Sequence, residues 1–231
     1  MQTRYSFLFT TFAVILMAVP GFGQIMITEI MYNAAGTDTG FEWVEVFNAG
    51  PSAEDISGWK IRDEDSNSAN WGEFPASTML NPGQVLIMTQ SSEADFKAAW
   101  PTATDAIIYT TADWGSIANT VDTIDNEVLT LLDDLDATVD VANYLTISPW
   151  PEGVNGSSIY VIPGAIDPTS NDDGANWLAS VVGMDGAVNP VAIYDLGNIG
   201  SPGVVVVPEV STYALLLGLF SLVGVMIRRR R

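Results

Sequence analysis

Carboxylates are the side chains with which this sequence could do chemistry. Its 231 residues include 28 Asp and Glu, but no His and no Cys. A Ser-His-Asp or Cys-His triad, a zinc site of thiolates and imidazoles, and a disulfide framework are therefore excluded. The sequence also lacks a Gly-rich phosphate loop, a nucleotide fingerprint and a serine-hydrolase motif.

Glu29, Glu42 and Glu45 are the candidates for acid–base or glycosidase chemistry, which pairs of carboxylates perform. Glu42 and Glu45 are three positions apart on an expected strand, so they should point to opposite faces, and at least one should face outward. Hydrogen bonding to turns, together with solvation, explains these residues without catalysis. We therefore expect no catalytic residue. Two carboxylates facing each other in a deep pocket would instead favour a hydrolase.

Clusters of aspartates are a second candidate site, because calcium takes oxygen ligands and needs neither His nor Cys. The cluster that we single out is Asp133, Asp134 and Asp136, at an expected turn between two strands. Segments 63–67 and 171–174 are similar, and none of the three completes an EF-hand loop. Because aspartates also stabilise turns without a metal, calcium remains an alternative, and we expect no cofactor.

The charges divide the chain into three parts. Five of the eight basic residues lie near the ends, at Arg4 and at positions 228–231. Residues 25–207 contain 27 acidic and three basic residues, a net charge of −24. Because affinity for nucleic acids rests on Lys and Arg, this charge argues against a nucleic-acid partner.

Residues 1–23 are typical of a secretory signal peptide. Arg4 precedes an apolar stretch over residues 7–19, which Pro20 ends, and small residues before Gln24 predict cleavage between Gly23 and Gln24. An uncleaved anchor is the alternative, but the apolar stretch is short for a bilayer span. We expect the protein to be exported.

The C-terminal end predicts a membrane helix. Residues 211–227 carry no charge, and 17 residues of helix reach about 25 Å, enough for a thin bilayer. Four arginines follow and should hold that end on the cytoplasmic side, namely Arg228, Arg229, Arg230 and Arg231. An ordinary single-pass anchor would show the same features.

A short motif precedes this helix, formed by Val207, Pro208, Glu209, Ser211 and Thr212. Together with the helix and the arginines, it resembles the PEP-CTERM sorting signal of Gram-negative bacteria, although Val210 stands where that family has a second proline. The resemblance covers residues 204–231. It implies processing by an exosortase-type membrane enzyme, a transient tether to the inner membrane, and delivery to the cell surface or the extracellular space, often with extracellular polysaccharide.

The remaining body consists of short β-type segments separated by Gly, Pro, Asn and Asp, which predicts an all-β fold. In the first segment, Ile25, Ile27 and Met31 alternate with residues expected on the opposite face. The expected strands are residues 25–32, 41–47, 56–62, 84–89, 106–110, 127–132, 137–144 and 157–162.

One short helix is expected between two of these strands. Ser91 or Ser92 can cap it, Glu93 and Asp95 suit its first turn, and Pro101 should end it. We expect this helix to connect two sheets.

Three ordered motifs carry a second resemblance, at residues 27–33 (ITEIMYN), 41–48 (FEWVEVFN) and 55–61 (DISGWKI). They resemble the lamin-tail domain family, and Gly200-Ser201-Pro202-Gly203 resembles its closing Pro-Gly. The resemblance implies an immunoglobulin-like β-sandwich over residues 24–203 that acts as an interaction module. It also favours packing roles for Trp43 and Trp59 over sugar stacking.

Together these features predict an exported, non-catalytic protein of the cell surface or extracellular matrix. Its expected partners are the processing enzyme, the membrane before processing, and extracellular polysaccharide or other surface proteins. A secreted carbohydrate- or calcium-binding module is the alternative, and a hydrolase that uses carboxylates alone is a weaker one.

Overall fold

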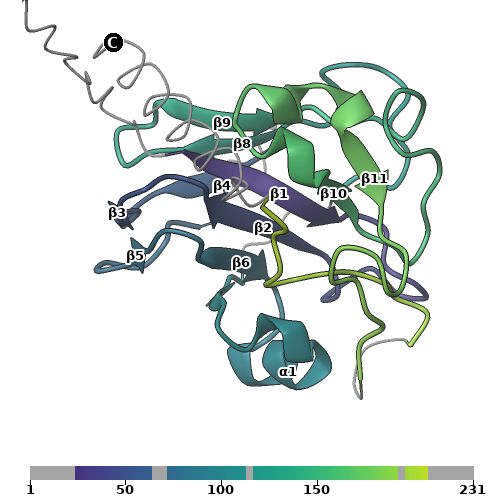
Figure 1. Cartoon of the computed structure of the whole chain (residues 1–231), viewed down its shortest axis with the longest axis horizontal. Coiled ribbons are helices and arrows are strands. Elements are labelled where there is room, and N and C mark those ends of the chain that lie inside the picture. Colours follow the sequence, from purple (N-terminus) through teal and green to yellow (C-terminus); the bar gives the residue numbers. More distant parts are fainter. Residues whose placement is uncertain (1–23, 64–71, 113–116, 192–195, 208–231) are drawn as a thin grey trace, which may run out of the picture.

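Strands dominate the part of the chain that the computed structural model describes, which is residues 24–63, 72–112, 117–191 and 196–207 (Figure 1). The expected signal peptide, the motif from Pro208 onward, the membrane helix at 211–227 and the four arginines lie outside these residues. Within the described ranges, no helix combines the length and apolar character needed to cross a membrane.

A six-stranded sheet forms the centre of the fold, in the order β11-β10-β1-β2-β6-β7. Its neighbours are antiparallel except for β6 and β7, which run parallel. The strands are β1 (Ile25–Met31), β2 (Trp43–Asn48), β6 (Val85–Thr89), β7 (Ile107–Thr110), β10 (Ile159–Val161) and β11 (Trp177–Ala179).

A three-stranded sheet, in the order β4-β8-β9, faces one side of the large sheet, and a two-stranded ribbon of β3 and β5 lies beside it. These strands are β4 (Lys60–Arg62), β8 (Leu129–Leu132), β9 (Thr138–Ala142), β3 (Glu54–Asp55) and β5 (Met79–Leu80). Short 3-10 helices complete the loops: η1 (Pro101–Ala103), η2 (Pro163–Ala165), η3 (Ser170–Asp172) and η4 (Gly174–Asn176).

The main core fills the space between the two sheets. Val44 from β2, Ile61 from β4 and Leu129 from β8 are fully buried in it. Trp150 and Trp177 close one end, with ring centroids 5.3 Å apart. The all-β expectation is confirmed, and the two facing sheets agree with an immunoglobulin-like sandwich.

The helix α1 (Glu93–Ala99) forms as expected, with Ser92 as its N-cap. The Ser92 hydroxyl accepts the Asp95 N–H at 3.1 Å, and the helix ends before Pro101. Its position differs from the expectation, because α1 joins β6 to β7 within one sheet instead of connecting two sheets. A parallel pair needs such a crossover.

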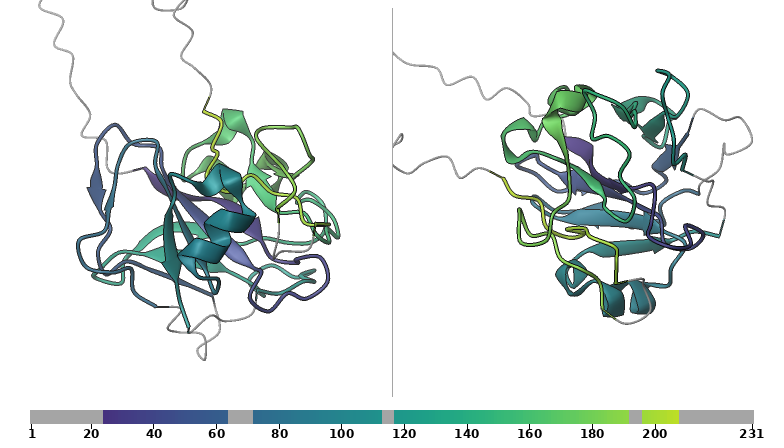
Figure 2. Two further views of the ribbon diagram at one scale, coloured as in Figure 1. Left: turned by 90° about the horizontal axis from the view of Figure 1, so that it is seen from below. Right: turned by 90° about the vertical axis from the view of Figure 1, so that its right-hand side faces the viewer.

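A second, smaller core lies under α1, on the outer face of the large sheet (Figure 2). Trp43 is fully buried there and meets the rings of Phe96 and Trp100 edge-on, each at 6.1 Å. Trp59 is also buried, in the main core, so the expected packing roles of both tryptophans are confirmed. The central strands are therefore covered on both faces.

Strand β1 does not alternate regularly along its whole length. Its pairing with β2 shifts between Ile27 and Glu29, which leaves Thr28 as the extra residue of a β-bulge. Ile27 consequently lies in the main core, whereas Met31, expected on the same face, lies in the core under α1. The bulge reverses the faces that simple alternation predicts.

Candidate functional site

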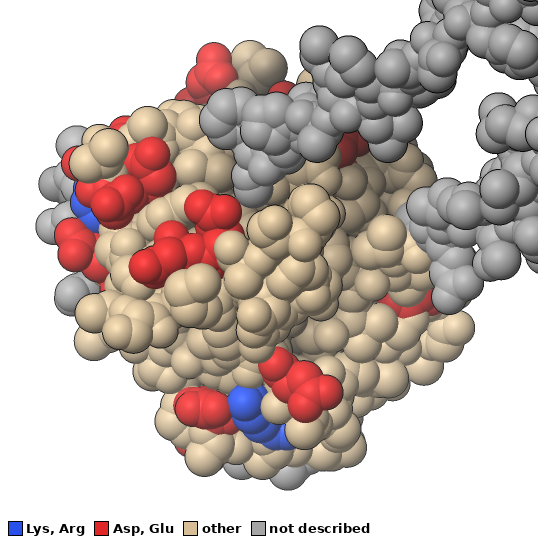
Figure 3. Space-filling model, turned by 60° about the vertical axis from the view of Figure 1, so that its left-hand side comes forward, with Lys and Arg blue, Asp and Glu red and all other residues tan. Residues whose placement is uncertain are grey.

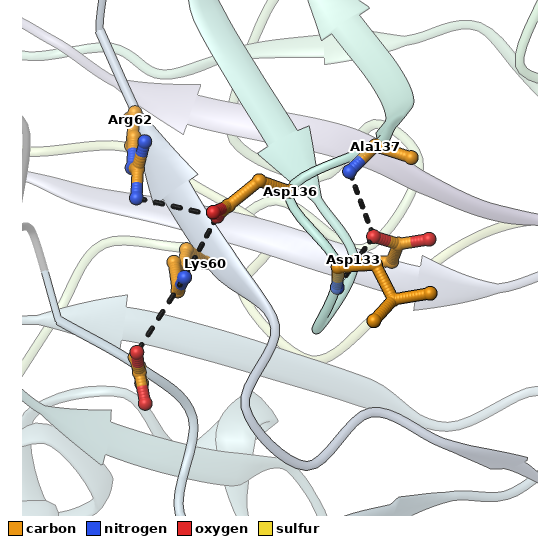
Figure 4. Close-up of polar contacts among 7 residues, drawn as sticks. Lys60, Arg62, Asp133, Asp136 and Ala137 are labelled. Atoms are coloured by element: carbon orange, nitrogen blue, oxygen red, sulfur yellow. Dashed lines mark hydrogen bonds and ion pairs between the residues drawn. The ribbon is translucent and has the colours of Figure 1, made fainter.

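In the aspartate cluster at the turn between β8 and β9, Asp133 and Asp136 are directed at different partners (Figure 4). Asp133 turns back on its own loop, where its Oδ1 accepts the N–H groups of Leu135 at 2.9 Å and Ala137 at 2.8 Å. Asp136 adopts a left-handed backbone conformation, with φ of 62°. These are the contacts of an aspartate that stabilises a turn.

Asp136 is directed at two cations instead of at a metal position. Its Oδ1 lies 2.7 Å from Lys60 Nζ and 3.4 Å from Arg62 Nη2, and Lys60 also reaches Glu73 at 3.5 Å. The hydrogen bond and charge of Lys60 hold the pKa of Asp136 below its usual value. Across the described ranges, no group of three or more Asp and Glu side chains could hold a metal ion. Asp133, Asp134 and Asp136 are therefore not brought together as calcium ligands.

All three basic residues of the described body are engaged with surface acids. Lys60 and Arg62 bind Asp136, and Lys97 binds Glu93 four residues earlier at 2.9 Å. On the face drawn in Figure 3, basic side chains appear only beside acidic ones. Any carboxylate inside the protein must therefore be balanced by hydrogen bonds or by a proton.

Glu29, Glu42 and Glu45 all lie inside the protein. Their exposed fractions are 1%, 4% and 0%, so the expectation of an outward-facing, solvated glutamate is wrong. The physical reason is that both faces of β2 are covered, one by the three-stranded sheet and the other by α1 and the last described residues. Alternation predicted opposite faces, but it could not show that neither face meets water.

Glu29 on β1 sits at the centre of a hydrogen-bond network. Its Oε1 accepts the Ser201 N–H at 2.8 Å and the Ser158 hydroxyl, and its Oε2 accepts the Ser201 hydroxyl at 2.8 Å. The Ser180 hydroxyl lies 3.5 Å from Oε1. Burial raises the pKa of Glu29 to about 7, although these donors act in the opposite direction.

Glu45 on β2 is the direct cross-strand partner of Glu29. It accepts the Thr28 hydroxyl at 2.8 Å and the Gly203 N–H at 2.7 Å. Burial, and then the charge of Glu29, raise the pKa of Glu45 to about 8. Like charges directly opposite each other in a sheet are destabilising, so the two carboxyls cannot both be ionised without a penalty.

The space beside this pair is small. The cavity bounded by Glu29, Glu45, Tyr160, Asp185, Ser201 and residues 204–206 has a volume of about 10 Å³. That volume holds about one water molecule. The pair thus meets the first condition for a carboxylate hydrolase, two buried acids side by side, but it has no pocket for a substrate.

A third buried acid, Asp140 on β9, links the two sheets at the bulge. Its Oδ2 accepts the Ile27 N–H at 2.7 Å and the Asn171 amide at 2.8 Å, and burial raises its pKa to about 7. In the described part of the chain, Asp140 Oδ1 and Asn171 Oδ1 are buried without a hydrogen-bond partner. Sequence reasoning considered Asn171 only within the candidate calcium segment 171–174, and it missed the role of Asp140, although an Asp between two valines on a strand was an available signal.

The fold is a β-sandwich of the immunoglobulin type that encloses several carboxylates. The sequence model of the Lamin Tail Domain family matches residues 18–146, more than half of the chain, and the chain belongs to this family. Lamin tail domains are immunoglobulin-like interaction domains. None of the curated proteins compared with the chain matches it. Strands β10 and β11 lie beyond the matched residues but extend the same sheet as β1.

Proposed function

We propose that this protein is an exported, non-catalytic interaction module of the cell surface or extracellular matrix, sorted by an exosortase-type system. The observation that carries the proposal is the motif at Val207, Pro208, Glu209, Ser211 and Thr212, which directly follows a lamin-tail sandwich and precedes an apolar stretch with four terminal arginines. Val207, the first residue of the motif and the last described residue, is 51% exposed.

A role in binding suits the arrangement of the acids. The buried acids Glu29, Glu45 and Asp140 hold strands and loops together, and the cavity beside the glutamate pair is too small for a sugar. The other carboxylates of the described body are mainly on its surface, where a large negative charge keeps an extracellular protein soluble. Such a surface repels nucleic acids and suits partners that present cations or neutral polar groups.

The sorting step is tested by producing the full-length chain in a Gram-negative host, with and without an exosortase-type enzyme. We expect mass spectrometry of the exported protein to find an N-terminus at Gln24 and no peptide beyond about Ser211, but only when the enzyme is present. Pro208→Ala should reduce this processing. Pro51→Ala, in an exposed turn of the body, is the matched control.

An exported protein that still carries Arg228–Arg231 when the enzyme is present would contradict sorting and support a permanent anchor. The interaction role is tested separately, by measuring retention of the processed protein on the host's isolated extracellular polysaccharide. Retention equal to that of an unrelated acidic protein would remove the matrix assignment.

A further inference from the structure

We propose that Glu29 and Glu45 hold at least one proton between them and act as a pH-dependent latch on the closing segment (residues 201–207), which detaches from the sheet when the last proton is lost. The latch joins β1 and β2 to the last described residues, which lie across the outer face of the sheet (Figure 1). It does not depend on the proposed function.

The attachment of the closing segment runs through the two carboxyls. Ser201 binds Glu29 by its N–H and its hydroxyl, both at 2.8 Å, and the Gly203 N–H binds Glu45 at 2.7 Å. Beyond Gly203, the one backbone hydrogen bond found among the described residues is internal, from the Val204 N–H to the Ser201 carbonyl. Val204 and Val205 add side-chain packing to these contacts.

The fit of the segment is close, so opening is a discrete step. A Cβ on Gly203, whose φ is 88°, would lie 2.6 Å from the Thr102 carbonyl oxygen. Val204 packs against Gly186, and Val205 joins the core under α1. Apart from about one water molecule in the small cavity, a segment packed at this distance cannot admit solvent to the carboxyls unless it moves away.

Among the described residues, no cation lies beside the pair. The groups that titrate or carry charge around it are Tyr160 on β10 and Asp185 in the loop after β11, and the Tyr160 hydroxyl donates to Asp185 at 2.7 Å. Neither supplies positive charge, and the three described basic residues are bound to surface acids. At least one proton on the pair is then needed to avoid two adjacent buried charges.

The donors around the two carboxyls place this proton on Glu45. Glu29 accepts from Ser158, from both groups of Ser201 and weakly from Ser180, and such donors stabilise an ionised carboxylate. Glu45 accepts two hydrogen bonds and lies next to the charge of Glu29, which opposes its ionisation.

Loss of the Glu45 proton leaves two negative charges opposite each other under a layer of valines. Removing that layer exposes both carboxyls to water, which screens their repulsion and restores their hydration. Opening therefore becomes more favourable as the pH rises through the range in which the pair loses its last proton. The apparent pKa values are about 7 and about 8, and they describe the two coupled carboxyls together. If the tail is a sorting signal, detachment of residues 201–206 would add a free stretch of chain between the sandwich and the motif that begins at Val207.

The test is hydrogen exchange of the full-length chain in detergent micelles, at about pH 6 and about pH 9, with exchange times scaled to the intrinsic rate at each pH. We expect the amides of Ser201, Gly203 and Val204, which are hydrogen-bonded in the closed segment, to lose about tenfold or more in protection between the two conditions, because one unit of pKa shift corresponds to a factor of ten. The amides of β2 should change less.

Glu45→Gln keeps the shape of the side chain and an acceptor for Gly203 but cannot ionise, so it should abolish the extra loss of protection. Glu152→Gln, on an exposed loop, is the matched control and should behave as the wild type. The latch is overturned if the amides of Ser201, Gly203 and Val204 respond as those of β2 do in the wild type. It is also overturned if Glu45→Gln responds as the wild type does.

A measurement on native glutamates covers the case in which Glu45→Gln does not fold. In Asp140→Asn, which removes another buried acid with a raised pKa, infrared spectra at about pH 6.5 should still show a protonated carboxyl that disappears by about pH 9. Absence of that band would overturn the assignment of a proton to the pair.

Discussion

Asp140 on β9 accepts the backbone N–H of Ile27 on β1 at 2.7 Å, and this hydrogen bond joins the two sheets of the sandwich. The N–H group is available because the bulge at Thr28 interrupts the pairing of β1 with β2. The Asn171 amide binds the same Asp140 oxygen at 2.8 Å and also reaches the Ile27 carbonyl at 3.2 Å. Side chains from two other elements thus provide hydrogen-bond partners for the Ile27 backbone groups that the bulge leaves unpaired.

Replacing Asp140 should separate its hydrogen-bonding role from its charge. Asp140→Ala removes the acceptor of two buried donors and should lower the free energy of unfolding by about 1–3 kcal/mol. Asp140→Asn keeps an acceptor oxygen and should cost less. Urea unfolding of the full-length chain measures both, with Asp105→Ala on the surface as the control. A loss in Asp140→Ala no larger than in Asp105→Ala would show that the hydrogen bonds to Ile27 and Asn171 contribute nothing.

The stability of the protein should fall as the pH rises from about 4.5 to about 8, because folding raises the pKa of Glu29 to about 7, of Glu45 to about 8 and of Asp140 to about 7. In this range the folded state holds protons that the unfolded state has released. The slope is about 1.4 kcal/mol per pH unit for each proton retained, and above the folded pKa values it levels off.

Urea unfolding at a series of pH values measures this slope. The experiment is done in about 0.5 M salt. Repulsion among ionised surface acids would also lower the stability as the pH rises, and salt at this concentration screens that repulsion. Combining Glu45→Gln with Asp140→Asn should flatten the profile. A stability that increases toward pH 8 would contradict the raised pKa values.

Two glycines in separate 3-10 helices, Gly164 in η2 and Gly174 in η4, should respond in opposite ways to alanine. At Gly174 a Cβ would lie 2.2 Å from Trp150 Cδ1, and Trp150 is held against Trp177. Gly174→Ala should therefore destabilise the protein by about 1–3 kcal/mol through overpacking. At Gly164 a Cβ would meet nothing within 4 Å, so Gly164→Ala should be neutral or slightly stabilising.

Thermal unfolding followed by tryptophan fluorescence distinguishes these two variants. A Gly174→Ala protein as stable as Gly164→Ala would show that the Trp150–Trp177 pair can move at little cost. The comparison uses the same substitution in the same kind of element, so helix propensity affects both alike.

Calcium should not stabilise the described body. Asp133 is bound to its own turn and Asp136 to Lys60 and Arg62, so a cation would have to displace contacts already made. We expect the same unfolding midpoint in millimolar calcium and in chelator. A calcium-dependent rise that is lost when Asp133, Asp134 and Asp136 are changed to Asn, and that magnesium does not reproduce, would restore the calcium-binding alternative.

The sequence by itself determined the local structure of the body. Turn residues and β-type segments located most of the strands, and Ser92 and Pro101 set the limits of α1. These signals are local, because capping and alternation depend on residues within a few positions of each other. The motif resemblance to lamin-tail domains placed the same segments in a sandwich, and the family match agrees.

Only the tertiary structure decided which carboxylates are buried and what they bind. Alternation separates two faces of a strand but does not reveal that both faces of β2 are covered, and the bulge at Thr28 changes the faces without a local signal. Ser201 meets Glu29 across 172 positions of sequence. Such a contact depends on strand order and on the path of the closing segment, which are properties of the assembled sheet and not of any stretch of sequence.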